Sequence, residues 1–273
     1  MSEPTIIQFR NVTKEFASRA LAHVGAKGLL TQFPKYIKGT RSARFTALRD
    51  VSFDVRRGER FAVIGVNGAG KSTTLALIAK VMRPTSGTIE TTGHICPLLE
   101  LGAGFHPDLT GRENVMLNGV LLGMTRREVR AKSDRILDFA GLGAFIDEPL
   151  RTYSSGMYAR LGFSVAVHLD PDILLVDEIL AVGDAAFQRK CYDRINEFHK
   201  RGVTFVMVTH DSNTVRTSCD RAMLLNNGGV ALCDTADRVV DEYMRLLNLP
   251  SAPVAPTPAA PAAEESQAES VHA

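Results

Sequence analysis

A glycine-rich run that ends in a lysine and two hydroxyl residues is the first feature of this chain that could do chemistry. The run GVNGAGKST at 65–73 matches the pattern GxxxxGK[ST]. In that pattern backbone N–H groups surround a polyphosphate, the lysine binds its outer phosphates and the next hydroxyl can ligate Mg²⁺. We therefore predict an ATP–Mg²⁺ site. Its residues are Gly65, Asn67, Gly68, Ala69, Gly70, Lys71, Ser72 and Thr73.

A second apolar run, DILLVDE at 172–178, ends in two adjacent carboxylates. Two adjacent carboxylates beside a hydrophobic core are energetically unfavourable unless they bind a cation or a proton. We predict that Asp177 holds Mg²⁺ through its water shell and that Glu178 orients or deprotonates the attacking water. The alternative is an ordinary strand end that meets solvent. The run VTFVMVTHD repeats this geometry, so His210 could contact a γ-phosphate or be only a polar loop residue.

A second anion site is suggested by YSSGM at 153–157, where a Ser-Ser-Gly turn enters an apolar helix. Free backbone N–H groups and the positive end of the helix dipole both favour an anion placed there. Because the chain already has one phosphate loop, this second site would have to serve another phosphate.

The elements that must position these residues follow an α/β pattern. Residues 5–12 and 48–55 alternate as strands do, and ERFAVIG at 59–65 is a buried strand that feeds the phosphate loop. Two apolar runs, at 172–178 and 203–210, are separated by a helical stretch, which is the βαβ signature of a parallel sheet.

Helical sequence dominates the stretch between these strands. Thr110 with Glu113, and Thr125 with Glu128, each have the spacing of a capping box at a helix start. We therefore predict a helical subdomain at about 100–168.

Composition excludes several classes of protein. A net charge of +2, with both signs spread along most of the chain, argues against nucleic acid as a partner. The four cysteines lack metal-ligand spacing and suit a reducing compartment. Neither a signal peptide nor an apolar run of membrane-spanning length is visible, so we expect any membrane role to come through a partner.

These motifs, in this order over about residues 5–247, resemble the ATP-binding cassette (ABC) ATPases. The resemblance implies an ABC-type P-loop NTPase with a mainly parallel sheet core, an antiparallel N-terminal subdomain and a helical subdomain. It also implies a head-to-tail homodimer, in which the signature motif of one subunit faces the phosphate loop of the other. The second anion site would then serve the partner's ATP.

The resemblance also implies roles for single residues. Ser154, Ser155 and Gly156 would contact the partner's γ-phosphate, Asp184 would lie in the loop between the two sites, and His210 would be the switch histidine. Phe16, in VTKEF, falls where an aromatic ring stacks on adenine, although core packing explains it equally well and Phe45 could compete.

Three departures from the common family pattern point to one branch. The signature reads YSSGM, the loop at Asp184 reads AVGD, and Glu100 and Leu101 stand where a Mg²⁺-contacting glutamine is usual. We assign that metal contact to Glu100. With LLELGAGFHPDLTGREN, these motifs resemble the branch that exports lipid-linked polysaccharides such as O-antigen, teichoic acid, capsule or galactan. The resemblance implies a separate integral membrane permease subunit, with this chain peripheral at the cytoplasmic face of the inner membrane.

Two segments flank or interrupt the expected nucleotide-binding domain, 1–249. The insert 17–49 holds seven Lys and Arg and no Asp or Glu, so it is either a solvated loop or a contact for anionic lipid and the pyrophosphate of the substrate. Residues 250–273 are rich in Ala and Pro, which predicts a disordered tail. Because branch members with a carbohydrate-binding domain carry it as a β-sandwich well past residue 250, the resemblance implies that none is expected here.

Three other functions fit parts of the pattern. The first is an ABC exporter of a drug or another lipid. The second is a soluble ABC ATPase of DNA repair or translation, which would need long coiled coils, or paired cassettes with a basic surface. The third is a phosphate-loop kinase or GTPase, which needs no signature helix.

Overall fold

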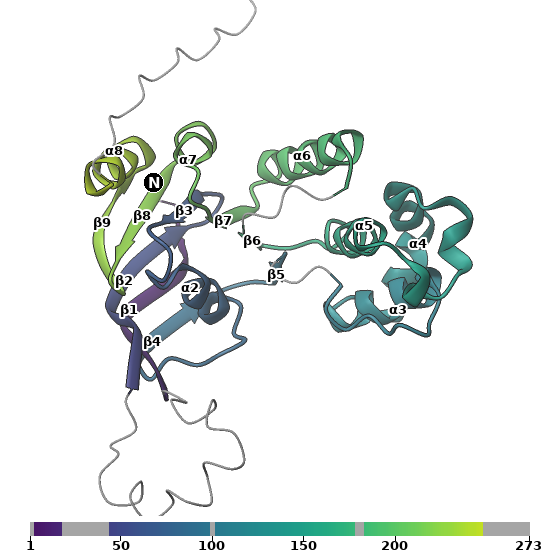
Figure 1. The fold of residues 1–273 in the computed structure, drawn as a ribbon, viewed down its shortest axis with the longest axis horizontal. Helices are drawn as coiled ribbons and strands as arrows, with labels where there is room; N and C mark the ends of the chain where they lie inside the picture. Colours follow the sequence, from purple (N-terminus) through teal and green to yellow (C-terminus); the bar gives the residue numbers. More distant parts are fainter. Residues whose placement is uncertain (1–2, 18–43, 99–101, 178–182, 248–273) are drawn as a thin grey trace, which may run out of the picture.

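The computed structural model describes residues 3–17, 44–98, 102–177 and 183–247 (Figure 1). Several predictions fall outside these described residues. They concern Glu178 as the base, Glu100 as a metal contact, and the choice between Glu100 and Leu101 for the position of the usual glutamine. Positions 18–43 of the basic insert and the tail 250–273 also lie outside the described residues.

A three-stranded antiparallel sheet, in the order β2–β1–β4, contains the first strands of the chain. Along β2, buried Val51, Phe53 and Val55 alternate with more exposed residues, as expected for a sheet with one covered face. The covered face packs on residues of β3 and α2 in one hydrophobic cluster. The strands are β1 Thr5–Ala17, β2 Arg44–Arg56 and β4 Ser86–Thr91.

A six-stranded sheet, in the order β5–β6–β7–β3–β8–β9, forms the centre of the fold. The first five strands are parallel, and β9 runs antiparallel to β8. Its central strands are almost wholly buried, because both faces of a parallel sheet are covered. The strands are β3 Arg60–Ile64, β5 Ile95–Pro97, β6 Ile173–Asp177, β7 Thr204–Val208, β8 Arg221–Asn226 and β9 Gly229–Thr235.

The helices cover this sheet and extend beyond one end of it. Thr110 and Thr125 cap α3 and α4 through reciprocal bonds with Glu113 and Glu128, so both predicted capping boxes are confirmed. In the part of the chain that the structure describes, no helix is long and apolar enough to cross a membrane. The helices are α2 Lys71–Ile78, α3 Gly111–Leu121, α4 Arg126–Ala140, α5 Ser155–Ala166, α6 Ala185–Lys200, α7 Ser212–Ser218 and α8 Ala236–Leu246, with 3-10 turns η1 Gly143–Asp147 and η2 Leu150–Thr152.

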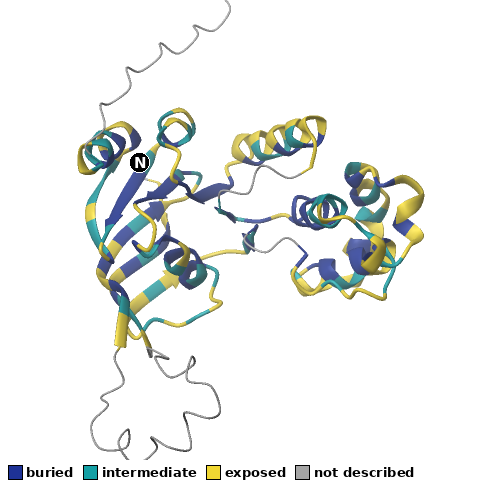
Figure 2. Cartoon of the chain, in the orientation of Figure 1, coloured by how far each residue is buried: buried dark blue, intermediate teal, exposed yellow. Residues whose placement is uncertain are grey.

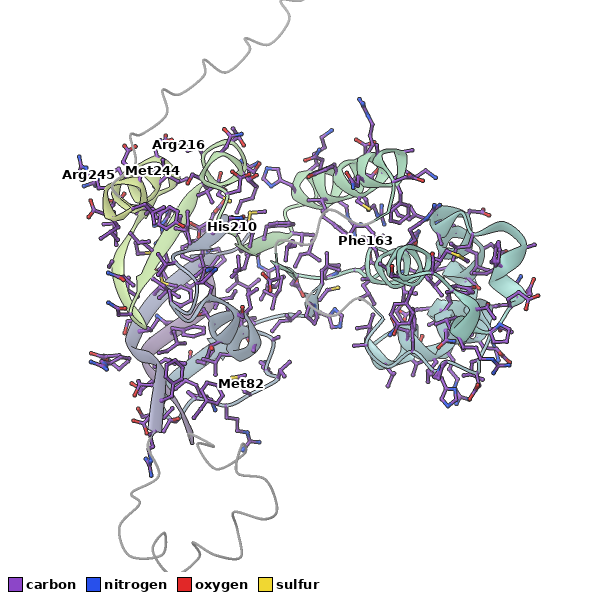
Figure 3. All side chains as sticks on the ribbon, viewed as in Figure 1. Met82, Phe163, His210, Arg216, Met244 and Arg245 are labelled. Atoms are coloured by element: carbon purple, nitrogen blue, oxygen red, sulfur yellow. The ribbon has the colours of Figure 1, made fainter. Side chains whose placement is uncertain are left out.

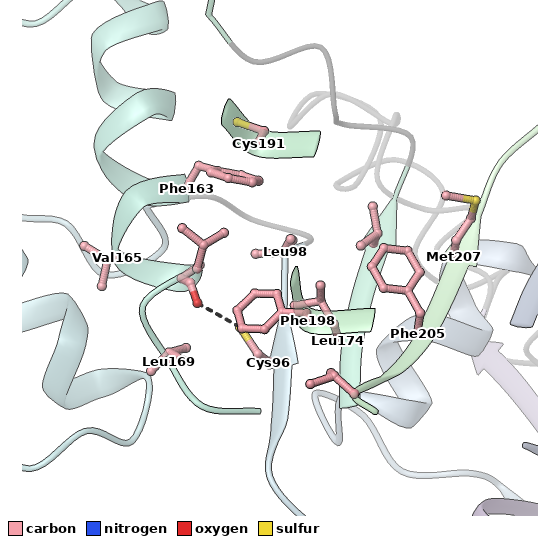
Figure 4. Close-up of a cluster of buried hydrophobic side chains, with 14 of the residues drawn as sticks. Cys96, Leu98, Phe163, Val165, Leu169, Leu174, Cys191, Phe198, Phe205 and Met207 are labelled. Atoms are coloured by element: carbon pink, nitrogen blue, oxygen red, sulfur yellow. Dashed lines mark hydrogen bonds between the residues drawn. The ribbon is translucent and has the colours of Figure 1, made fainter. Parts of the chain in front are cut away.

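Helices α3, α4 and α5 gather at one end of the molecule, far from the antiparallel sheet (Figure 1). Their buried faces turn toward one another and toward the sheet (Figure 2). Figure 4 shows the junction, where Phe163 of α5 lies on the side that faces Leu98 and Phe198. The Cys96 thiol of β5 donates to Ala166 O over 3.8 Å at this junction. The helix that begins with the second predicted anion site is therefore anchored on the edge of the central sheet.

Three of the four cysteines contribute packing and no thiolate chemistry. All four are unpaired. Burial raises the pKa of the Cys96, Cys191 and Cys219 thiols to about 12, so at neutral pH they stay protonated. Because the thiolate is the reactive form, none of these three can act as a nucleophile.

Candidate nucleotide site

The phosphate loop connects the end of β3 at Ile64 to the start of α2 at Lys71. Gly70 precedes the helix with φ 109°, in the left-handed region. A β-carbon there would lie 2.6 Å from Leu48 Cδ2 and 2.7 Å from Ala47 O. Only glycine fits both this backbone conformation and this close approach. The tight path of the loop therefore depends on Gly70.

The Lys71 side chain lies within the loop and is only 9% exposed. Its ammonium group donates to Gly65 O over 2.8 Å and to Val66 O over 3.2 Å. Both acceptors are uncharged carbonyl oxygens. Because a buried cation is costly unless an anion compensates it, this ammonium group is placed to bind an outer phosphate.

The rest of the loop is open to a ligand. Asn67 and Gly68 are exposed, whereas Ala69 is buried beneath them. Ser72 is exposed and Thr73 half-buried in the first turn of α2, where backbone N–H groups have no partner within the helix. The positive end of the helix dipole adds to these donors, so this helix start suits an anion.

Two predicted residues lie at the same edge of the sheet as the phosphate loop. Asp177 is the last residue of β6, and His210 follows the end of β7. Strands β6, β7 and β3 are parallel neighbours, so their carboxyl ends lie side by side. His210 is exposed and lies between β7 and α7 (Figure 3). The structure thus gathers the loop, a carboxylate and an imidazole at the edge where parallel sheets bind ligands.

Ser72 and Asp177 form a donor set that fits Mg²⁺. Among the described residues, no three His, Cys, Asp or Glu side chains gather into a metal cage. Mg²⁺ in nucleotide sites usually keeps several waters and takes one or two protein oxygens together with phosphate. The Ser72 hydroxyl and the Asp177 carboxylate, at a single sheet edge, would supply these two protein oxygens.

The signature segment forms the start of α5. Ser154 is the N-cap, and its Oγ accepts a hydrogen bond of 3.2 Å from Met157 N. Ser155 and Gly156 follow in the first turn, and both serines are exposed. Figure 1 shows α5 well apart from α2, so the two anion sites of one chain do not face each other.

Asp184 caps α6, where its carboxylate accepts a hydrogen bond of 2.8 Å from Phe187 N. The same carboxylate lies 3.6 Å from the guanidinium of Arg160. Arg160 also donates to Ala140 O and Gly141 O and lies 4.9 Å from the Phe187 ring. It therefore joins α4, α5 and the start of α6. Sequence analysis missed Arg160, although it is the one charged residue in α5.

The two candidate adenine-stacking rings lie side by side. Phe16 and Phe45 are opposite each other in the β1–β2 ladder, so their side chains lie on the same face of that sheet. Phe16 is 38% exposed and Phe45 57% exposed, which excludes core packing as the explanation for Phe16. The ammonium group of Lys14 lies 5.1 Å from the centre of the Phe16 ring.

A buried asparagine holds the loop before α3 and was also missed by sequence analysis. The Asn114 side chain is fully buried. Its Oδ1 accepts from His106 N over 2.7 Å, and its Nδ2 donates toward the carbonyls of His106, Leu109 and Thr110 over 2.9 to 3.0 Å. The signal in the sequence is a polar residue on the inner side of an amphipathic helix.

Replacing Asn114 by alanine is expected to lower the free energy of unfolding by about 3 kcal/mol, because a fully buried side chain and all of its hydrogen bonds would be lost, and the His106 N–H would lose its acceptor. Asn118→Ala is the matched control. Asn118 is nearly as buried, but it makes one bond, to Ala103 O, and its own Oδ1 is unpartnered. Urea unfolding measures both variants, and equal losses would contradict the role assigned to Asn114.

Together, the loop, the helix start and the strand-end residues define a P-loop nucleotide-binding protein with an inserted helical region. A family model described as ABC transporter matches residues 48–181. The O-antigen export system ATP-binding protein RfbB of Klebsiella pneumoniae is 47% identical over 242 residues, which cover 89% of this chain and 98% of that protein. The teichoic acids export ATP-binding protein TagH of Listeria monocytogenes is 39% identical over 237 residues, 87% of this chain and 69% of TagH. The chain belongs to the ABC transporter family.

Solved structures agree on the fold. A dimeric, post-hydrolysis state of the ATP-binding cassette MJ0796 with ADP and Pi is similar with a TM-score of 0.64 and 23% identity, over 85% of this chain and 99% of that one. An ATP-binding subunit of an ABC transporter gives a TM-score of 0.66 at 24% identity, over 91% and 95%. The predictions of an ABC-type fold and an ABC-type ATPase are confirmed.

Proposed function

We propose that this chain is the ATPase subunit of an exporter that moves a lipid-linked polysaccharide across the cytoplasmic membrane. One observation carries the proposal: 47% identity to an O-antigen export ATP-binding protein along almost the whole length of both chains. The TagH relative has the same kind of role for another envelope polymer. Both names describe the export of a bacterial envelope glycan. We therefore assign this function to the chain.

The active assembly is a homodimer with two composite ATP sites. One chain carries a phosphate loop on α2 and a second anion site at Ser154 on α5, and these stand apart (Figure 1). A two-fold axis would bring each loop opposite the partner's Ser154–Gly156 segment and complete both sites at once. The dimeric arrangement of the MJ0796 cassette supports this proposal.

Within each site the residues of this chain divide the work. Lys71 and the first turn of α2 bind the phosphates, while Ser72 and Asp177 hold Mg²⁺, which neutralises developing charge on the phosphoryl group. Glu178 orients or deprotonates the water, and His210 contacts the γ-phosphate from the end of β7. Phe16 or its neighbour Phe45 stacks on adenine.

Passage of the glycan belongs to a separate membrane permease. In this proposal the chain acts from the cytoplasmic face of the inner membrane, against the permease. Residues 1–249 form the nucleotide-binding domain in this proposal, and the basic insert 17–49 would contact anionic lipid. The described ends of the insert, Ala17 and residues 44–49, belong to strands β1 and β2.

Co-purification from the native host tests the proposal. A tagged chain, extracted from membranes in mild detergent, is expected to bring with it a polytopic membrane protein and a polyprenyl-linked sugar detectable by mass spectrometry. The chain purified from the soluble fraction serves as the control. Recovery with a drug-exporter permease, or with no membrane protein at all, would contradict the proposed substrate.

A further inference from the structure

Tyr158 connects the signature helix to the segment that leads into α3. Its hydroxyl donates a hydrogen bond of 2.9 Å to Gly102 O. Its ring meets the Phe105 ring edge to face, with centres 5.0 Å apart and planes at 79°. Gly102 and Tyr158 are 56 positions apart in the sequence, so this contact joins two distant parts of the chain.

The segment at Gly102 is shaped to receive this side chain. Gly102 is buried and has φ 82°, and a β-carbon on it would lie 2.5 Å from Tyr158 Cε1 and 2.7 Å from the Phe105 ring. Its carbonyl also accepts from Phe105 N over 2.9 Å, which closes a tight turn. The next carbonyl, of Ala103, accepts from Asn118 over 2.7 Å. The turn is therefore fixed from α3 and from α5 together.

Tyr158 also lies one helical turn after the N-cap of α5. Its backbone N–H donates to Ser154 O over 2.9 Å, in the first hydrogen-bonded turn of the helix. Ser154 is the residue proposed to contact the partner's nucleotide. Anything that holds Tyr158 in place therefore holds the start of α5.

We propose that Tyr158 is a positioning residue for the partner's ATP site. By anchoring the first turn of α5 to the turn at Gly102, it sets the direction in which Ser154 and Gly156 are presented across the dimer. Without the hydroxyl, the start of α5 is less restrained in the free subunit. It therefore loses more conformational entropy when the dimer closes. This inference rests on the proposed homodimer with composite sites.

Tyr158→Phe isolates the effect of the hydroxyl, because it keeps the ring against Phe105 and leaves Gly102 O bonded to Phe105 N. We expect the Kd of the single subunit for ATP to change less than twofold, because Tyr158 is remote from the phosphate loop of its own chain. At low protein concentration the turnover per subunit should fall about three- to tenfold, the range expected from one net hydrogen bond. The deficit should shrink as protein concentration rises, since a weakened dimer is restored by mass action.

The experiment measures ATP turnover against protein concentration, together with sedimentation of the dimer in Mg²⁺ and a non-hydrolysable ATP analogue. Tyr192→Phe, which removes an exposed hydroxyl from α6, is the matched control and should behave as wild type. A Tyr158→Phe protein that dimerises and turns over as wild type would overturn the inference. If the wild type itself shows no ATP-dependent dimer, the proposed composite site fails instead, so the two failures can be told apart.

Discussion

A Glu178→Gln variant is expected to bind ATP as wild type does and to hydrolyse it at least about 10²-fold more slowly, the usual contribution of a general base. Glu178 directly follows Asp177, the last residue of β6, at the sheet edge that also carries the phosphate loop. Glutamine keeps the size and much of the hydrogen bonding of glutamate but cannot accept a proton. The cycle should therefore stop after ATP binding, and the ATP-bound dimer should accumulate.

Phosphate release and sedimentation with ATP measure the two consequences together. Glu90→Gln, on the exposed strand β4 of the antiparallel sheet, gives the same change of charge away from the site and should leave both unchanged. Hydrolysis at the wild-type rate in the Glu178 variant would show that another group activates the water. Slow hydrolysis without accumulation of a dimer would contradict the composite site.

Local sequence signals predicted the parts of the fold that depend on nearby residues. The capping boxes at Thr110 and Thr125, the buried strand before the phosphate loop, and the helix that begins at Ser155 all follow from spacings of a few positions. Each is fixed by hydrogen bonds or burial that the adjacent residues make themselves. Such features are readable before any tertiary contact is known.

The long-range contacts could not be predicted from the sequence. Arg160 reaches Asp184, and Tyr158 reaches Gly102, only because α4, α5 and α6 pack together. Neither pair has a sequence spacing that indicates a contact. The choice between Phe16 and Phe45 was open for the same reason, because a long insert separates them along the chain. The structure places the two rings opposite each other, so strand position does not decide between them.

Lys71→Ala is expected to abolish ATP binding, and with it ATP-dependent dimerisation. The Lys71 ammonium group is buried in the loop, and among the described residues its hydrogen bonds go to the uncharged carbonyls of Gly65 and Val66, so its charge is available to phosphate. Charge-assisted hydrogen bonds to phosphate are about twice as strong as neutral ones. Alanine removes them together with the only buried positive charge among the described residues of the loop.

Thermal unfolding with and without ATP and Mg²⁺ separates loss of binding from loss of folding. At about 100 times its Kd, a ligand stabilises the folded state by about 2.7 kcal/mol, which corresponds to a rise in Tm of about 5 °C or more for a domain of this size. Wild type and Lys190→Ala, which removes an exposed lysine from α6, should both show this rise. Lys71→Ala should not show it. Its Tm without nucleotide should nevertheless be no lower than that of wild type, because the substitution removes a buried cation that forms no ion pair with the described residues. A lower Tm without ATP would mean that Lys71 stabilises the loop itself, and an undiminished ATP-induced rise would exclude Lys71 from the phosphate site.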